Sequence, residues 1–200
     1  MTDERRPPTP DQIERSFAAE EEGSFAGIPS GFIRPIGWIV VYTAKIDAQI
    51  ENMIHGLRGL SMQDTALPQN RLKIPFRRKT EEARALAEAQ MPPKIYKPVP
   101  SLLKRAEAIQ KQRDDLVHGD WYSFHPQDRF ATKMRPGTGD GRFRPVKFDV
   151  PALWALAWEA REIYGGLSTV GQHYSNYRFF TSPDNSHIEW PEGIEEIWQE

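Results

Sequence analysis

Apolar residues recur at alternating spacings of three and four along several stretches of this chain. This alternation places side chains on one face of a helix and is typical of helices that pack in a bundle. The first such stretch follows Pro35, a residue favoured in the first turn of a helix. Its stripe consists of Ile36, Ile39, Thr43, Ile46, Ile50, Met53, Leu57 and Leu60. His55 lies off this stripe, so we expect it on the surface.

The last long stretch repeats the pattern. Asp149 is placed to cap a helix, and Pro151 fits its first turn. The stripe that follows consists of Leu153, Leu156, Ala160, Ile163, Leu167, Val170, Tyr174 and Tyr177. The pair Gly165–Gly166 weakens this helix near its middle, which predicts a kink or a close crossing with another helix.

Two shorter helices are predicted between these stretches. Thr80 is a suitable N-cap for the first of them, which Pro92 and Pro93 end. The second runs from Ser101 to Gly119. Its apolar positions are Leu102, Ala106, Ile109 and Leu116.

Arg113 continues the apolar spacing of this third helix, at a position where an apolar residue is expected. Violations of a local pattern concentrate at functional sites. His118 follows five residues later, beside the glycine that ends the helix. The helix therefore ends with a permanently charged guanidinium and an imidazole that titrates near neutral pH.

The segment after this helix has a different pattern. Three prolines and the turn sequence PGTGDG fall within residues 122–148, between short runs of alternating apolar residues. We therefore predict a mainly α fold: an antiparallel four-helix up-and-down bundle with a short β-hairpin or extended insertion between the third and fourth helices. The bundle covers residues 34–180. Residues 1–33 are predicted to be disordered or extended, and 181–200 to form an acidic tail that docks in part.

Composition narrows the classes of function. The chain has 200 residues and a net charge of −2. It contains no cysteine, so disulfides and thiolate metal sites are excluded. No signal peptide is apparent, and the longest apolar run, 36–42, is too short to span a bilayer. We therefore expect a cytoplasmic protein without a membrane partner.

The charge is unevenly distributed along the chain. Residues 71–147 contain eighteen Lys or Arg against nine Asp or Glu. A basic segment of this kind indicates a polyanionic partner such as RNA. The alternative is that these bases only cover solvent-exposed helix faces.

The sequence Arg113-Asp114-Asp115-Leu116-Val117-His118-Gly119 resembles the R-polar-x(3–5)-H motif of the HEPN superfamily. This resemblance implies a four-helix bundle that forms a homodimer and acts as a metal-independent endoribonuclease. It also implies a role in toxin–antitoxin or phage-defence systems, where an antitoxin would be a separate protein. Active members often carry asparagine after the arginine, where this chain has Asp114.

The roles implied by the motif are chemically coherent. Arg113 would bind the scissile phosphate, His118 would act as general acid and base, and Asp114 would orient them. No cofactor or metal is expected. The set His118, Asp120, His125 and Asp128 matches no standard metal-ligand spacing.

The alternative is a non-catalytic helical bundle that binds nucleic acid or a protein partner. In that case Arg113 would pair with a buried carboxylate from another helix, and His118 would only cap the helix.

Overall fold

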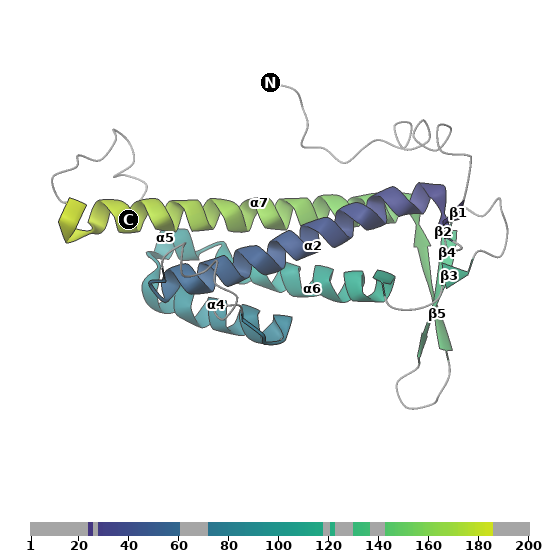
Figure 1. Cartoon of the computed structure of the whole chain (residues 1–200), viewed down its shortest axis with the longest axis horizontal. Coiled ribbons are helices and arrows are strands. Elements are labelled where there is room, and N and C mark those ends of the chain that lie inside the picture. Colours follow the sequence, from purple (N-terminus) through teal and green to yellow (C-terminus); the bar gives the residue numbers. More distant parts are fainter. Residues whose placement is uncertain are drawn as a thin grey trace, which may run out of the picture. The chain divides into compact units, whose positions relative to one another are not determined.

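The computed structural model describes residues 24–25, 28–60, 72–117, 121–122, 130–136 and 143–185. These residues are mainly helical, so the predicted mainly α class is confirmed (Figure 1). The chain divides into two units. Unit 1 comprises residues 1–43 and 109–161, and unit 2 comprises residues 44–108 and 162–200. The three long helices α2 (Ser30–Leu57), α6 (Val99–Val117) and α7 (Val150–Thr181) each contribute to both units.

The remaining elements are short. In unit 2 they are α4 (Phe76–Gln90), α5 (Pro93–Tyr96) and a 3-10 helix at Pro183–Asn185. In unit 1, β1 (Ser24–Phe25) pairs antiparallel with β2 (Ile28–Pro29). A second sheet has the order β3 (Trp121–Tyr122), β4 (Phe130–Pro136), β5 (Phe143–Asp149), and both of its pairings are antiparallel.

Two predicted helix starts are wrong. α2 begins at Ser30, so Pro35 lies inside the helix rather than in its first turn. Because α2 begins before Pro35, Phe32 lies within the helix and is buried, at 2% exposure. This burial offsets the hydrogen bond that Pro35 cannot donate. α4 begins at Phe76, directly after Pro75, so Thr80 is not its N-cap. The buried Thr80 hydroxyl instead lies 2.8 Å from the Arg77 carbonyl oxygen and 2.5 Å from Glu107 Oε1.

Two other predicted boundaries are confirmed. Asp149 caps α7, because its Oδ1 accepts a hydrogen bond of 2.7 Å from the Ala152 N–H. α4 ends at Gln90, just before the two prolines that cannot continue it.

The core of unit 1 joins the N-terminal half of α2, the end of α6 and the start of α7. It consists of Phe32, Ile39, Leu116, Val150, Leu153 and Ala157. All six side chains are at most 2% exposed. The residues of the apolar stripe predicted for α2 are buried from Ile39 to Leu57. Leu60, the last residue of that stripe, lies beyond the helix and is 37% exposed.

In unit 2, α2 contacts both α4 and α7. Lys79 and Glu82 of α4 contact Asp47 and Arg58 of α2. Between α2 and α7, the ammonium of Lys45 lies 5.5 Å from the ring of Tyr164 and Arg178 Nη1 donates to the Gly56 carbonyl. The residue numbers increase together in both pairs of helices, so α2 runs in the same direction as α4 and α7.

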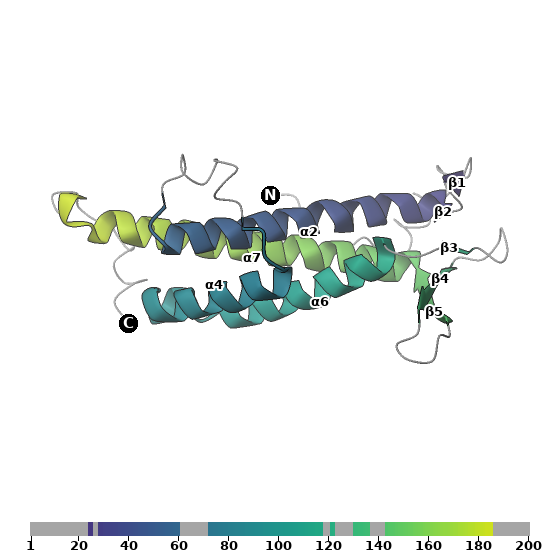
Figure 2. The same ribbon diagram turned by 60° about the horizontal axis from the view of Figure 1, so that its bottom comes forward.

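This direction differs from the strict up-and-down alternation predicted from the sequence. Leu72, which precedes α4, lies beside the middle of α2, because its N–H donates to Glu51. The chain then reverses through α5, so that Thr80 of α4 lies against Glu107 of α6. Figure 2 shows α4 and α6 side by side.

The close helix crossing predicted at the glycine pair is present in unit 2. A Cβ atom placed on Gly166 would lie 2.7 Å from Leu102 Cδ2 of α6, whereas a Cβ on Gly165 would meet no atom within 4 Å. Glycine at 166 therefore allows α6 and α7 to approach closely. Among the described helices, none is both long enough and apolar enough to cross a membrane.

We predict that the two glycines respond differently to the same substitution. Gly165→Ala should stabilise the protein by about 0.5–1 kcal/mol, because alanine favours the helix and meets no neighbour. Gly166→Ala should be less stable than Gly165→Ala by roughly 1–3 kcal/mol, because Leu102 must move. Urea unfolding of both variants measures this difference. Equal stabilities would show that the crossing does not need a glycine.

Candidate functional site

Packing in unit 1 fixes the C-terminal end of α6, where the predicted site lies. Ile109 and Leu116 are 2% and 1% exposed, as the apolar spacing of this helix predicted. Leu116 packs in the core with Phe32 of α2 and Leu153 of α7. Arg113 lies between them on the same spacing, yet 27% of its side chain remains exposed. Arg113 is therefore anchored by buried neighbours while it keeps contact with solvent.

The ion-pair partner of Arg113 is the next residue on its own helix. Arg113 Nη1 lies 3.0 Å from Asp114 Oδ1, and the Asp114 side chain is 48% exposed. Gln110 Nε2 also donates to this oxygen, at 3.2 Å. The alternative prediction of a buried carboxylate from another helix therefore does not describe this contact. An exposed pair of this kind contributes about 0–1 kcal/mol, so a phosphate can compete for the guanidinium.

His118 lies outside the described residues, as do Asp120, His125 and Asp128. The pairing of Arg113 with His118 therefore stays a prediction. In the part of the chain that the structure describes, no group of three or more His, Asp or Glu is arranged to hold a metal ion.

Aromatic side chains of unit 1 contact arginines. The guanidinium carbon of Arg34 lies 6.0 Å from the ring of Trp154, and that of Arg161 lies 4.6 Å from the ring of Trp158. Trp38 lies 6.4 Å from Trp154 between ring centroids and is 41% exposed. Unit 1 thus combines accessible aromatic surface with cationic groups, a combination that can stack bases and attract phosphates.

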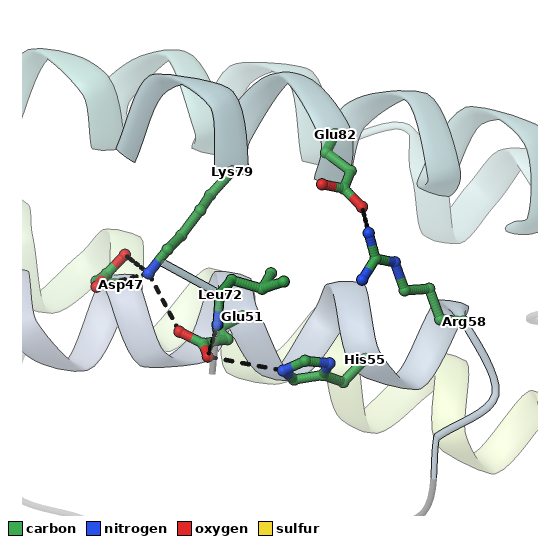
Figure 3. A network of polar contacts seen from close by, with 7 residues as sticks. All are labelled: Asp47, Glu51, His55, Arg58, Leu72, Lys79 and Glu82. Carbon is green, nitrogen blue, oxygen red and sulfur yellow. Dashed lines mark hydrogen bonds and ion pairs between the residues drawn. The ribbon is translucent and has the colours of Figure 1, made fainter. Parts of the chain in front are cut away.

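Unit 2 contains a second polar cluster, which connects α4 to α2 (Figure 3). The ammonium of Lys79 lies 2.9 Å from Asp47 Oδ1 and 3.1 Å from Glu51 Oε2. The Lys79 side chain is only 7% exposed and that of Glu51 18%, so their charges are largely removed from water. Arg58 and Glu82 form a further ion pair between the same helices.

The cluster shifts two pKa values in opposite directions. Burial alone raises the pKa of Glu51, but the hydrogen bond from the Leu72 N–H and the contacts with Lys79 and His55 outweigh it, so the net pKa is lowered. Burial alone lowers the pKa of Lys79, but the hydrogen bonds and charges of Asp47 and Glu51 outweigh it, so the net pKa is raised. Both shifts keep the pair ionised.

The expectation that His55 lies on the surface is wrong. Its side chain is 2% exposed, and its Nε2 lies 3.6 Å from Glu51 Oε1. Neither ring nitrogen has a hydrogen-bond partner among the described residues. A signal for this cluster was present in the sequence: Asp47, Glu51 and His55 are spaced by four residues, which places them on one helix face. The partner Lys79 comes from a distant segment and could not be inferred from that spacing.

No family model matches this chain, and neither a curated protein nor a solved structure matches it.

We predict that Lys79→Met destabilises the protein at pH 7 by roughly 1–3 kcal/mol, because it leaves Glu51 ionised in a largely buried position. Half-exposed Asp47 adds less, since water screens its charge. The penalty should shrink as the pH falls below the ordinary pKa of Glu51 and the carboxylate is protonated. Urea unfolding of wild type and variant between pH 3 and 7 measures this.

The control is Arg77→Met, which breaks the exposed pair between Arg77 and Glu81 on the same helix. Because the Arg77 side chain is 84% exposed, this change should have little effect at any pH. A Lys79→Met penalty that does not depend on pH would contradict the assigned role of Glu51.

Proposed function

We propose that this chain is a HEPN-like, metal-independent endoribonuclease of a toxin or phage-defence system. The observation that carries the proposal is the state of Arg113. It occupies a position on an otherwise apolar helix spacing, it is 27% exposed, and its ion-pair partner Asp114 is itself 48% exposed. A guanidinium in this position is available to an anion that arrives from solvent.

In the proposed reaction the RNA supplies its own nucleophile. The imidazole of His118 takes the proton from a 2′-hydroxyl, whose oxygen attacks the adjacent phosphorus. The bond from phosphorus to the 5′-oxygen breaks, and a protonated imidazole gives that oxygen a proton. The products are a 2′,3′-cyclic phosphate and a 5′-hydroxyl. No metal takes part in these steps.

In this proposal Arg113 binds the scissile phosphate and stabilises the charge that develops on its oxygens. On an ideal helix a separation of five residues places two side chains about 140° apart, so His118 does not automatically share the face of Arg113. A homodimer resolves this problem if one copy supplies the arginine and the other the histidine. The same proposal includes the fold: the helices correspond to the helical bundle of the family, and strands β4 and β5 are an insertion in it.

We predict that the purified protein cleaves labelled RNA in the presence of EDTA. Arg113→Ala should lower the rate by about 10²–10³, because it removes a donor to the transition state. His118→Ala should lower it by about 10²–10⁴, because it removes the general acid and base. Cleavage is followed on denaturing gels with separate assays for cyclic phosphate ends.

Lys111→Ala is the matched control, because it removes an exposed positive charge from the same helix, two residues away from Arg113. It should retain nearly the full rate. Equal cleavage by wild type, Arg113→Ala and His118→Ala would mean that the activity belongs to a contaminant, and the proposal would fail.

A second candidate function is RNA binding without cleavage. Two observations favour it: Asp114 already partners Arg113, and exposed Trp38 offers a surface for base stacking. In this reading Arg113 contacts phosphate and no strand is cut.

We predict that Asp114→Asn strengthens RNA binding, since the guanidinium loses its competing carboxylate. The slope of log K against log salt should become steeper by up to about one, as expected for one additional phosphate contact. Fluorescence anisotropy across a salt series measures both quantities. Asp184→Asn removes the same charge from an exposed residue in unit 2 and serves as the control. If both variants behave alike, Asp114 only contributes to net charge.

A further inference from the structure

One face of α2 in unit 1 presents apolar side chains to solvent. Trp38 is 41% exposed and Val41 is 52% exposed. Arg34, Trp38 and Val41 are four and three residues apart, so they lie along the same face of the helix, and Arg34 is exposed as well. Neighbouring apolar side chains at a surface, unlike single ones, indicate an interaction site.

Two aromatic rings hold Trp38 in place without stacking on it. The ring centroids of Trp38 and Tyr42 are 5.5 Å apart and their planes are inclined by 39°. The centroids of Trp38 and Trp154 are 6.4 Å apart and their planes are inclined by 56°. Because neither neighbour lies flat on the indole and 41% of Trp38 is exposed, part of its ring is open to a planar group from solvent.

Arg34 adds a positive charge beside these rings. Its guanidinium carbon lies 6.0 Å from the centroid of the Trp154 ring. A cation–π contact does not consume the N–H donors of a guanidinium, which can still bind a phosphate. Arg34 is also the only charged residue in the sequence of the two segments that carry this surface, 30–43 of α2 and 150–158 of α7. Their own charge therefore favours an anionic partner.

An unpaired nucleotide combines a flat base with an adjacent phosphate, whereas the bases of a duplex are already stacked on each other. We propose that Trp38 stacks on a base of single-stranded RNA and that Arg34 binds a neighbouring phosphate, with Trp154 supporting both side chains. This inference rests on the proposed function for the identity of the ligand, but it does not require cleavage.

Fluorescence anisotropy of the full chain with a short labelled 2′-O-methyl oligonucleotide tests the proposal. This strand lacks the 2′-hydroxyl nucleophile, so binding is measured without cleavage. Trp38→Ala should weaken binding of the single strand about 5–150-fold, the range for loss of one aromatic–base stack. It should leave the affinity for the same strand annealed to its complement unchanged, because paired bases do not reach the indole.

Three further variants separate base stacking from a general apolar contact. Trp38→Phe keeps an aromatic ring and should recover most of the affinity that Trp38→Ala loses. Arg34→Gln should reduce the slope of log K against log salt by up to about one, as expected for one lost phosphate contact. Val41→Ala, the matched control, removes an exposed apolar side chain from the same face and should change the affinity by less than about twofold. Helical circular dichroism shows that each variant is folded.

Equal single-strand affinities in wild type and Trp38→Ala, or an equal loss in Trp38→Phe or Val41→Ala, would overturn the proposal. So would sedimentation that shows a dimer for wild type and a monomer for Trp38→Ala, because this face would then hold a second copy of the chain. Failed cleavage of unmodified RNA together with binding that depends on Trp38 would remove only the proposed ribonuclease. Cleavage that depends on Arg113 without such binding would remove only this subsite.

Discussion

The buried ion pair between Lys79 and the carboxylates of α2 is the interaction on which the arrangement of unit 2 depends. A lysine with 7% exposure is tolerated only when its charge is compensated, and here Asp47 and Glu51 provide this compensation. The pair fixes the start of α4 against the middle of α2. Two other residues of α4 make contacts nearby. Thr80 contacts Glu107 of α6, and Glu82 forms an ion pair with Arg58 of α2. Contacts of Lys79 and of its neighbours Thr80 and Glu82 therefore join α4 to both α2 and α6.

The helices themselves were readable from the sequence because their apolar spacing reports burial directly. Leu153, Ile163 and Leu167 are buried as their spacing predicted, and the Asp149 cap could be identified from its position before Pro151. Helix starts were less predictable. Pro35 and Thr80 each have a local preference for a helix start, but α2 begins at Ser30 and α4 at Phe76. The extension of α2 buries Phe32, whereas in α4 the added residues include the buried Lys79 and the exposed Arg77 and Arg78. The direction of one helix relative to another could not be inferred from the sequence, because it depends on where the connection between them brings the chain.

The candidate site was partly predictable for a similar reason. Sequence spacing identified Arg113 as the irregular position among buried neighbours, and its 27% exposure agrees with that reading. The resemblance gave Asp114 the role of orienting Arg113, and the two side chains do contact each other, although adjacent residues on a helix do not normally face each other. The buried position of His55 was also missed, since His55 lies off the apolar stripe of α2 from which burial was inferred.

The parallel course of α2 and α7 has a consequence for the order in which this protein can fold. Arg178 and the Gly56 carbonyl, which bond across the two helices, are separated by 122 positions in the chain. During synthesis α2 leaves the ribosome long before α7 exists, so part of its apolar face has no partner until most of the chain has been made. Folding of unit 2 is therefore completed only after translation of its last helix.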